Sequence, residues 1–192
     1  MPDAVLAGVG GQGTVLSTRL LAEAALLSGY DVKTSEVHGM AERGGTVVSA
    51  VRWGEKVYSP LVPAGSADFL LVFELLEGLR ELGYLSPRGI AIVNPYRMDP
   101  LPVLRGDAVY PEDALERISE RAGRTMIVPA RELAMEAGSA RALGSCLLGA
   151  LSIFLDFPRE AWRQAVERYC PQRFVEVNLK AFELGREYAG RS

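Results

Sequence analysis

The stretch GVGGQG, at residues 8–13, decides how the rest of the sequence is interpreted. It follows a short apolar run, AVLA at residues 4–7, and precedes TVLSTRLLAEAALLSG at residues 14–29. The latter segment repeats leucine and alanine at helical spacing and ends at Gly29, a residue typical of helix C-termini. The sequence therefore predicts a strand, a glycine turn and a helix, which together make a Rossmann-like first βα unit.

The glycine turn fits the pattern G-x-G-x-x-G through Gly8, Gly10 and Gly13. Backbone amides in such a turn, together with the N-terminus of the helix that follows, can accept a phosphate group. We therefore predict cofactor or phosphate binding by Gly10, Gly11, Gln12 and Gly13. Two alternatives stay open at this point: the glycines only allow close packing of strand and helix, or the turn holds a dinucleotide.

Strand and helix patterns alternate along the remaining chain. The segments that read as strands are residues 46–53, 68–73, 89–94 and 124–130, with a hairpin partner at 56–61 and a short strand at 107–110. Helical patterns follow at 74–82 and 111–123, and four more from about residue 129 onward make the C-terminal third helical. We expect a three-layer α/β/α fold with a mostly parallel, mixed sheet.

Length and composition limit the class of protein. The 192 residues, 48% of them hydrophobic, suit a single domain over residues 1–192. A net charge of −3 and a pI near 5.4 argue against nucleic acid as a partner. The longest apolar run, residues 142–155, is shorter than the roughly 18 residues of a membrane span. The start MPDAVLAG lacks a signal-peptide pattern, so we expect no membrane association and a cytoplasmic location.

A second polar loop, SEVHGMAERGG at residues 35–45, holds the only histidine of the chain, His38, together with Arg43. Loops after parallel strands meet at one edge of the sheet, so this loop and the glycine turn are expected to share a crevice. His38 is a candidate catalytic residue, although a loop histidine also serves as a simple hydrogen-bonding group. Arg43 is a candidate for anion binding, because a guanidinium can bind phosphate or carboxylate through two hydrogen bonds.

A nicotinamide site would require an acid after the second strand, and Glu36 is the candidate for that role. Thr14 and Ser17 lie where the predicted helix begins and are expected to cap it rather than bind a ligand. Cys146 and Cys170 are isolated from each other and are expected to be packing residues. We predict no metal ligand in the chain.

These motifs also carry a family resemblance. The order of G-x-G-G-Q-G, E-V-H-G-M-A-x-R-G-G and V-V-S-x-V-R, followed by the tail EVNLKAFELGREY, resembles the gamma domain of the thiamine-diphosphate-dependent 2-oxoacid:ferredoxin oxidoreductases. The resemblance is strongest to the members that act on indolepyruvate, and it covers nearly the whole chain. One departure is Gly144, where similar proteins usually place asparagine before the helix.

The resemblance implies oxidative decarboxylation of an aryl 2-oxoacid with coenzyme A (CoA), giving an aryl acyl-CoA, carbon dioxide and reduced ferredoxin. Thiamine sites of this type need a GDG followed by NN, and this sequence has no such pair. An iron–sulfur cluster needs four thiolates, and the sequence has two cysteines. Thiamine diphosphate, Mg and the 4Fe–4S clusters are therefore expected in a larger alpha subunit. A free-standing NAD(P)-binding oxidoreductase and a ligand-free structural subunit remain the alternatives.

Overall fold

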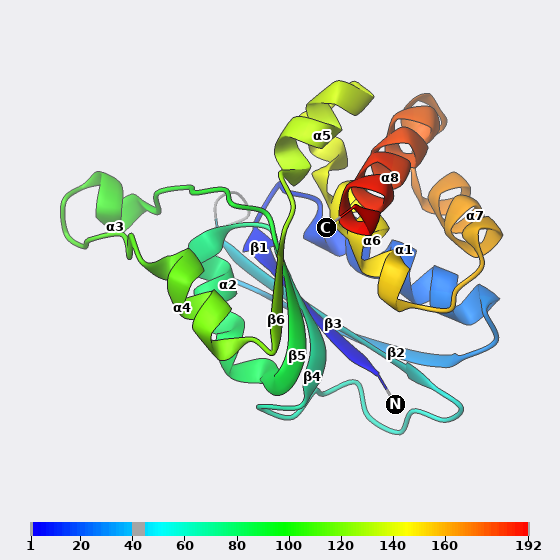
Figure 1. Cartoon of the computed structure of the whole chain (residues 1–192), viewed down its shortest axis with the longest axis horizontal. Coiled ribbons are helices and arrows are strands. Elements are labelled where there is room, and N and C mark those ends of the chain that lie inside the picture. Colours follow the sequence, from blue (N-terminus) through cyan, green and yellow to red (C-terminus); the bar gives the residue numbers. More distant parts are fainter. Residues whose placement is uncertain (1, 40–44, 192) are drawn as a thin grey trace.

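The computed structural model of the chain describes residues 2–39 and 45–191. Within these residues a six-stranded sheet has the strand order β2-β3-β1-β4-β5-β6 (Figure 1). The strands are β1 (Asp3–Val9), β2 (Asp31–His38), β3 (Thr46–Gly54), β4 (Ala67–Val72), β5 (Leu85–Val93) and β6 (Arg124–Ile127). Strands β1, β4, β5 and β6 are parallel neighbours, whereas β3 is antiparallel to both β1 and β2. The predicted mixed, mostly parallel sheet is confirmed.

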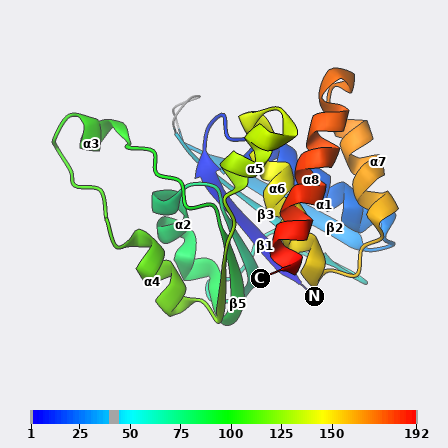
Figure 2. The same ribbon diagram turned by 45° about the horizontal axis from the view of Figure 1, so that its top comes forward.

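Helices cover both faces of this sheet (Figures 1 and 2). The α-helices are α1 (Thr14–Leu27), α2 (Leu75–Glu81), α3 (Leu101–Leu104), α4 (Ala114–Arg121), α5 (Ala130–Ala137), α6 (Leu143–Leu151), α7 (Arg159–Tyr169) and α8 (Val175–Gly190). Helices α1 and α5–α8 pack on one face, and α2 and α4 pack on the other. The three-layer architecture is therefore confirmed, with the helical C-terminal third forming most of one layer.

Strand β1 is buried on both faces because its side chains alternate between two cores. Ala4 and Leu6 join the large core under α1 and α5–α8, whereas Val5 and Ala7 join the smaller core under α2 and α4. A central strand with helices on both sides needs apolar residues at every position, and AVLA satisfies that need. The buried strand brings the glycine turn to the edge of the sheet where β4, β5 and β6 also end.

Two details of the predicted strands are wrong. Residues 55–66 form no strand, because side chains rather than a paired backbone satisfy this segment: Asp31 accepts from the Val57 amide, and Arg52 donates to the carbonyls of Ser59 and Leu61. Residues 107–110 also form no strand and belong to a protruding segment, residues 95–113, that carries α3 away from the sheet (Figures 1 and 2). The antiparallel pairing comes instead from β3, which lies between β1 and β2.

Candidate functional site

The glycine turn connects the end of β1 to the start of α1. Gly11 and Gly13 have φ angles of 99° and 87°, in the left-handed region that favours glycine. The side-chain Oε1 of Gln12 accepts a hydrogen bond from the Val9 amide at 2.8 Å, and the Gln12 amide donates to the Val9 carbonyl at 3.1 Å. Glutamine and glycine at these positions therefore give the turn a fixed backbone shape.

Two amides of this turn remain available to a ligand. Within the described residues, the amides of Gly11 and Gly13 donate no hydrogen bond. Gly13 is the N-cap of α1, and no side chain caps the helix. The expected capping by Thr14 and Ser17 is wrong, because the Ser17 hydroxyl donates to the Gly13 carbonyl and the Thr14 hydroxyl is buried without a partner in the described part of the chain. Uncapped amides at a helix N-terminus favour an anion.

The two ends of the second loop lie close to the glycine turn. His38 pairs with Val47 at the end of β2, and the Gly10 amide donates to the Gly45 carbonyl at 2.8 Å. Both ends of the loop thus lie at the edge of the sheet that holds the glycine turn. Arg43 and the side chain of His38 lie outside the described residues.

Glu36 lies in the wrong place for a dinucleotide site of the usual kind. In that fold the acid belongs to the strand beside β1. Here Glu36 is on β2 and pairs with Ser49 of β3, which separates β2 from β1. Because neighbouring strands are about 4.8 Å apart, the acid lies one strand spacing, roughly 5 Å, beyond the position expected for a ribose contact. This geometry disfavours NAD(P).

A pocket of about 260 Å³, here named the cationic pocket, opens beside the turn. Its lining residues are Gly10, Gly11, Gln12, Asn94, Tyr96, Met98, Arg131, Ala140, Arg141 and Leu143. The guanidinium of Arg131 lies 5.0 Å from the centroid of the Tyr96 ring. Within the described residues, neither Arg131 nor Arg141 forms an ion pair.

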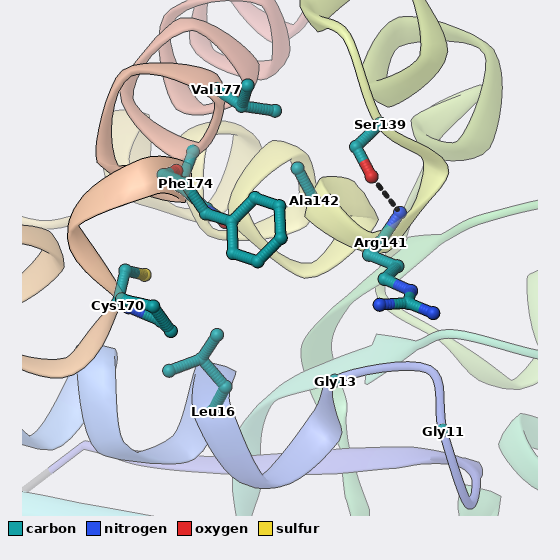
Figure 3. Close-up of a pocket in the computed structure, with 11 residues that line it drawn as sticks. Gly11, Gly13, Leu16, Ser139, Arg141, Ala142, Cys170, Phe174 and Val177 are labelled. Atoms are coloured by element: carbon teal, nitrogen blue, oxygen red, sulfur yellow. Dashed lines mark hydrogen bonds between the residues drawn. The ribbon is translucent and has the colours of Figure 1, made fainter.

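A neighbouring pocket of about 230 Å³, here named the apolar pocket, shares part of its lining with the cationic pocket. Its lining residues are Gly11, Gly13, Leu16, Ser139, Arg141, Ala142, Cys170, Pro171, Phe174, Val177 and Asn178. Figure 3 shows the Phe174 ring between α1 and the start of α6, with the Arg141 side chain extending toward the turn. Gly11 and Arg141 belong to both pockets.

Sequence reasoning missed both arginines and Phe174. No spacing pattern connects these positions to the glycine turn, because the packing of α5, α6 and α8 on the sheet brings them there. The one available signal was weak: Arg141 directly precedes the apolar segment that becomes α6.

Gly144 marks a close approach between α6 and α1. A Cβ at this position would collide with the Ser17 hydroxyl and would lie 3.3 Å from the Phe73 ring. The asparagine usual in similar proteins therefore does not fit here while Ser17 keeps its place. Among the residues just before α6 that line the pockets, Arg141 is the charged one.

The protruding segment is anchored beside the cationic pocket by one buried carboxylate. Glu74, which is 1% exposed, accepts hydrogen bonds from the Glu77 amide at 2.9 Å, the Met98 amide at 3.0 Å and the Tyr110 hydroxyl at 2.6 Å. Glu74 is therefore the N-cap of α2 and also fixes both ends of the protruding segment.

The two cysteines have no electrostatic activation. Both are buried and unpaired, and burial raises the pKa of the Cys146 thiol to about 12 and that of Cys170 above its usual value. They lie on α6 and after α7, so they do not form the four-thiolate set of an iron–sulfur cluster. Among the described residues, no cluster of three or more histidine, cysteine or acidic side chains has the arrangement of a metal site. None of the described helices is long and apolar enough to cross a membrane.

Comparison with known proteins places this geometry in a family. The model of the pyruvate ferredoxin/flavodoxin oxidoreductase family matches residues 3–188. The chain belongs to this family. It is 42% identical over 186 residues to the indolepyruvate oxidoreductase subunit IorB of Thermococcus kodakarensis, with 94% of this chain and 92% of that protein covered. The predicted resemblance is confirmed, and the chain is a gamma-type subunit of the 2-oxoacid:ferredoxin oxidoreductases.

Solved structures of the family share the fold. The gamma subunit of a keto/oxoacid ferredoxin oxidoreductase from Geobacter sulfurreducens superimposes with a TM-score of 0.73 at 25% identity, and both chains are fully covered. A 2-oxoglutarate:ferredoxin oxidoreductase from Magnetococcus marinus has a TM-score of 0.76 at 20% identity, and the match spans 31% of its chain. The same fold therefore occurs in this family both as a separate subunit and as part of a longer chain.

Proposed function

We propose that this chain, as one gamma-type domain over residues 1–192, is the subunit without thiamine or clusters in an oxidoreductase for indolepyruvate and related arylpyruvates. The complex would decarboxylate the 2-oxoacid oxidatively with CoA, yielding an aryl acyl-CoA, carbon dioxide and reduced ferredoxin. The observation that carries this proposal is the similarity over nearly the whole chain to proteins named as indolepyruvate oxidoreductase subunits. The substrate name comes from those relatives.

A larger alpha subunit would hold thiamine diphosphate, Mg and the 4Fe–4S clusters and would pass electrons to ferredoxin. The described residues of this chain do not fit those groups, because Cys146 and Cys170 are buried apart from each other and no cluster of metal-ligating side chains occurs among them. We therefore assign this chain no step that passes through a metal or a cluster. Its proposed role is to bind a phosphate group and to form part of a cleft that it shares with the larger subunit.

The proposed contribution of this chain is a phosphate site at Gly10, Gly11, Gln12 and Gly13. The free amides of Gly11 and Gly13 at the start of α1 support this role. His38, as a catalytic candidate, and Arg43, as an anion-binding candidate, would face the CoA or thiamine end of the cleft. This placement is supported by the position of the two loop ends, which lie close to the glycine turn.

Co-expression with the larger subunit tests the assignment. The two chains are expected to purify as one complex that reduces a viologen dye when given indolepyruvate and CoA. The chain purified alone is expected to be colourless and inactive. Separate elution of the two chains on gel filtration, together with an inactive mixture, would show that the assignment is wrong. Saturable NADH binding to the single chain would instead favour the dinucleotide alternative.

A further inference from the structure

The protruding segment, residues 95–113, presents a group of apolar side chains to solvent. Met98, Leu101, Leu104 and Val109 are 42%, 56%, 69% and 90% exposed, and none of the four belongs to either hydrophobic core. The segment carries α3 away from the rest of the chain (Figure 2). Isolated exposed apolar residues are common on protein surfaces, but several of them on one projecting segment are typical of a protein–protein interface.

Polar contacts fix the base of the segment, where its two ends come together. The Arg97 guanidinium donates to Asp99 and to Glu112, each at 2.6 Å, and lies 4.3 Å from the centroid of the Tyr110 ring. Below these residues the buried Glu74 carboxylate accepts from the Met98 amide and from the Tyr110 hydroxyl. The network joins residues from both ends of the segment, so it sets the direction in which the segment projects.

The tip of the segment is folded as well. The Arg105 amide donates to the Leu101 carbonyl at 3.0 Å, and the Asp107 amide donates to the Pro102 carbonyl at 2.8 Å. Prolines at residues 95, 100, 102 and 111 restrict the backbone further. A segment that is ordered before it binds loses less conformational entropy when a partner covers it. The apolar group is therefore presented on a preorganised support.

The position of the segment decides which partner fits. It begins directly after β5, at the edge of the sheet where β1, β4 and β5 end together. Met98 belongs to the exposed apolar group and also lines the cationic pocket, so the apolar surface is continuous with the candidate site. In the proposed complex the larger subunit brings its cofactors to a cleft at this edge and therefore covers it. A second copy of this chain seated on the segment would obstruct that approach.

We propose that the protruding segment is a docking element, and that Leu101, Leu104 and Val109 insert into an apolar groove of the larger, cofactor-bearing subunit. The inference deepens the proposed function and rests on it for the identity of the partner. Residues 101–109 contain one base, Arg105, and one acid, Asp107, so the tip has no net charge. The contact is therefore apolar rather than electrostatic, and Glu74 acts on it only by holding the base of the segment in place.

Amide hydrogen exchange in the native complex and in the chain alone is the first test. The amides of residues 101–109 are expected to exchange at least tenfold more slowly in the complex, because the larger subunit covers them. Residues 55–59 provide the internal reference. They follow β3 at the opposite edge of the sheet, where Arg52 pairs with Asp3, and their exchange should not change.

A double variant, Leu104→Ser with Val109→Ser, is the second test. The two subunits should associate at least tenfold more weakly, a loss of about 1.4 kcal/mol, measured by sedimentation of the diluted complex. The urea midpoint of the chain alone should stay native, because both side chains are exposed. Leu26→Ser with Leu27→Ser is the matched control, since these leucines are exposed at the end of α1 opposite the glycine turn.

Three results would overturn the proposal. The first is unchanged exchange of residues 101–109 in an assembled native complex, and the second is an equal loss of association in the two double variants. The third is self-association of the chain alone that the Leu104 and Val109 substitutions abolish, because a second copy would then be the occupant. Failure of the native chain to form any complex with the larger subunit would refute the proposed function itself, so the two failures are distinguishable.

Discussion

Residues 94–98 and residues 140–143 both line the cationic pocket, yet different contacts hold them in place. Residues 140–143 lead into α6, whose backbone approaches α8 through Gly149 and Gly185 so closely that neither position has room for a Cβ. Residues 95–98 begin the protruding segment, which is held by hydrogen bonds to the Glu74 carboxylate. Loss of close packing between two core helices affects the stability of the whole fold, whereas loss of a hydrogen-bonded anchor affects mainly the segment that it holds. The two sides should therefore respond differently to single substitutions.

The largest effect is expected for Gly149→Ala. The added Cβ would collide with the Phe182 carbonyl and would lie 2.9 Å from the Arg186 amide, so α6 and α8 would have to separate. We expect a loss of about 3 kcal/mol in the free energy of unfolding, measured by urea denaturation. Gly190→Ala is the control in α8, because its Cβ meets no atom within 4 Å. A native urea midpoint for Gly149→Ala would contradict close packing as the anchor of this side.

A smaller and more local effect is expected for Glu74→Ala. The Met98 and Glu77 amides and the Tyr110 hydroxyl would all lose their acceptor, and at least one would remain buried. We expect a loss of about 2 kcal/mol in the free energy of unfolding, with faster amide exchange confined to residues 95–113 and the start of α2. Tyr110→Phe removes one of the three bonds to Glu74 together with the acceptor of the Leu76 amide, and should lose about 1 kcal/mol. Uniformly faster exchange across the sheet would show that the anchor is not local.

The same contrast explains what the sequence predicted well. Apolar runs such as residues 4–7 and 69–73 are buried on both faces where helices cover the sheet, so local pattern and tertiary structure agree. The predicted hairpin at 56–61 is wrong because the side chains of Asp31, which is distant in sequence, and of Arg52 satisfy that backbone. The position of β3 between β1 and β2 also has no local signature.

The candidate site divides in the same way. The glycine turn is contiguous in sequence, and the positive φ angles of Gly11 and Gly13 are what its glycines predict. Arg131, Arg141 and Phe174 reach the turn only through the packing of α5, α6 and α8 on the sheet. No residue spacing encodes that arrangement. A single sequence therefore predicts the glycine turn but not the arginines and the phenylalanine that lie beside it.

The smallest effect on stability is expected for Gly11→Ala. The same variant tests whether the glycine turn, which lines both pockets, binds a ligand. An added Cβ at Gly11 meets no atom within 4 Å, but its φ of 99° strains any other residue. Gly29→Ala is a matched control, because Gly29 has a φ of 90°, equally open surroundings and a place at the opposite end of α1. Both variants should lose about 1 kcal/mol in the free energy of unfolding of the single chain.

Only Gly11→Ala should also change ligand binding. Its Cβ and altered backbone would disturb the free amides where a phosphate must approach, so the apparent CoA affinity of the assembled complex should fall about tenfold, or 1.4 kcal/mol. Gly29→Ala should keep native affinity, since the end of α1 lies away from both pockets. Equal affinities in the two variants would mean that the glycines serve the fold alone. Any ligand would then contact only the residues on the two sides of the pocket, such as Arg131 and Arg141.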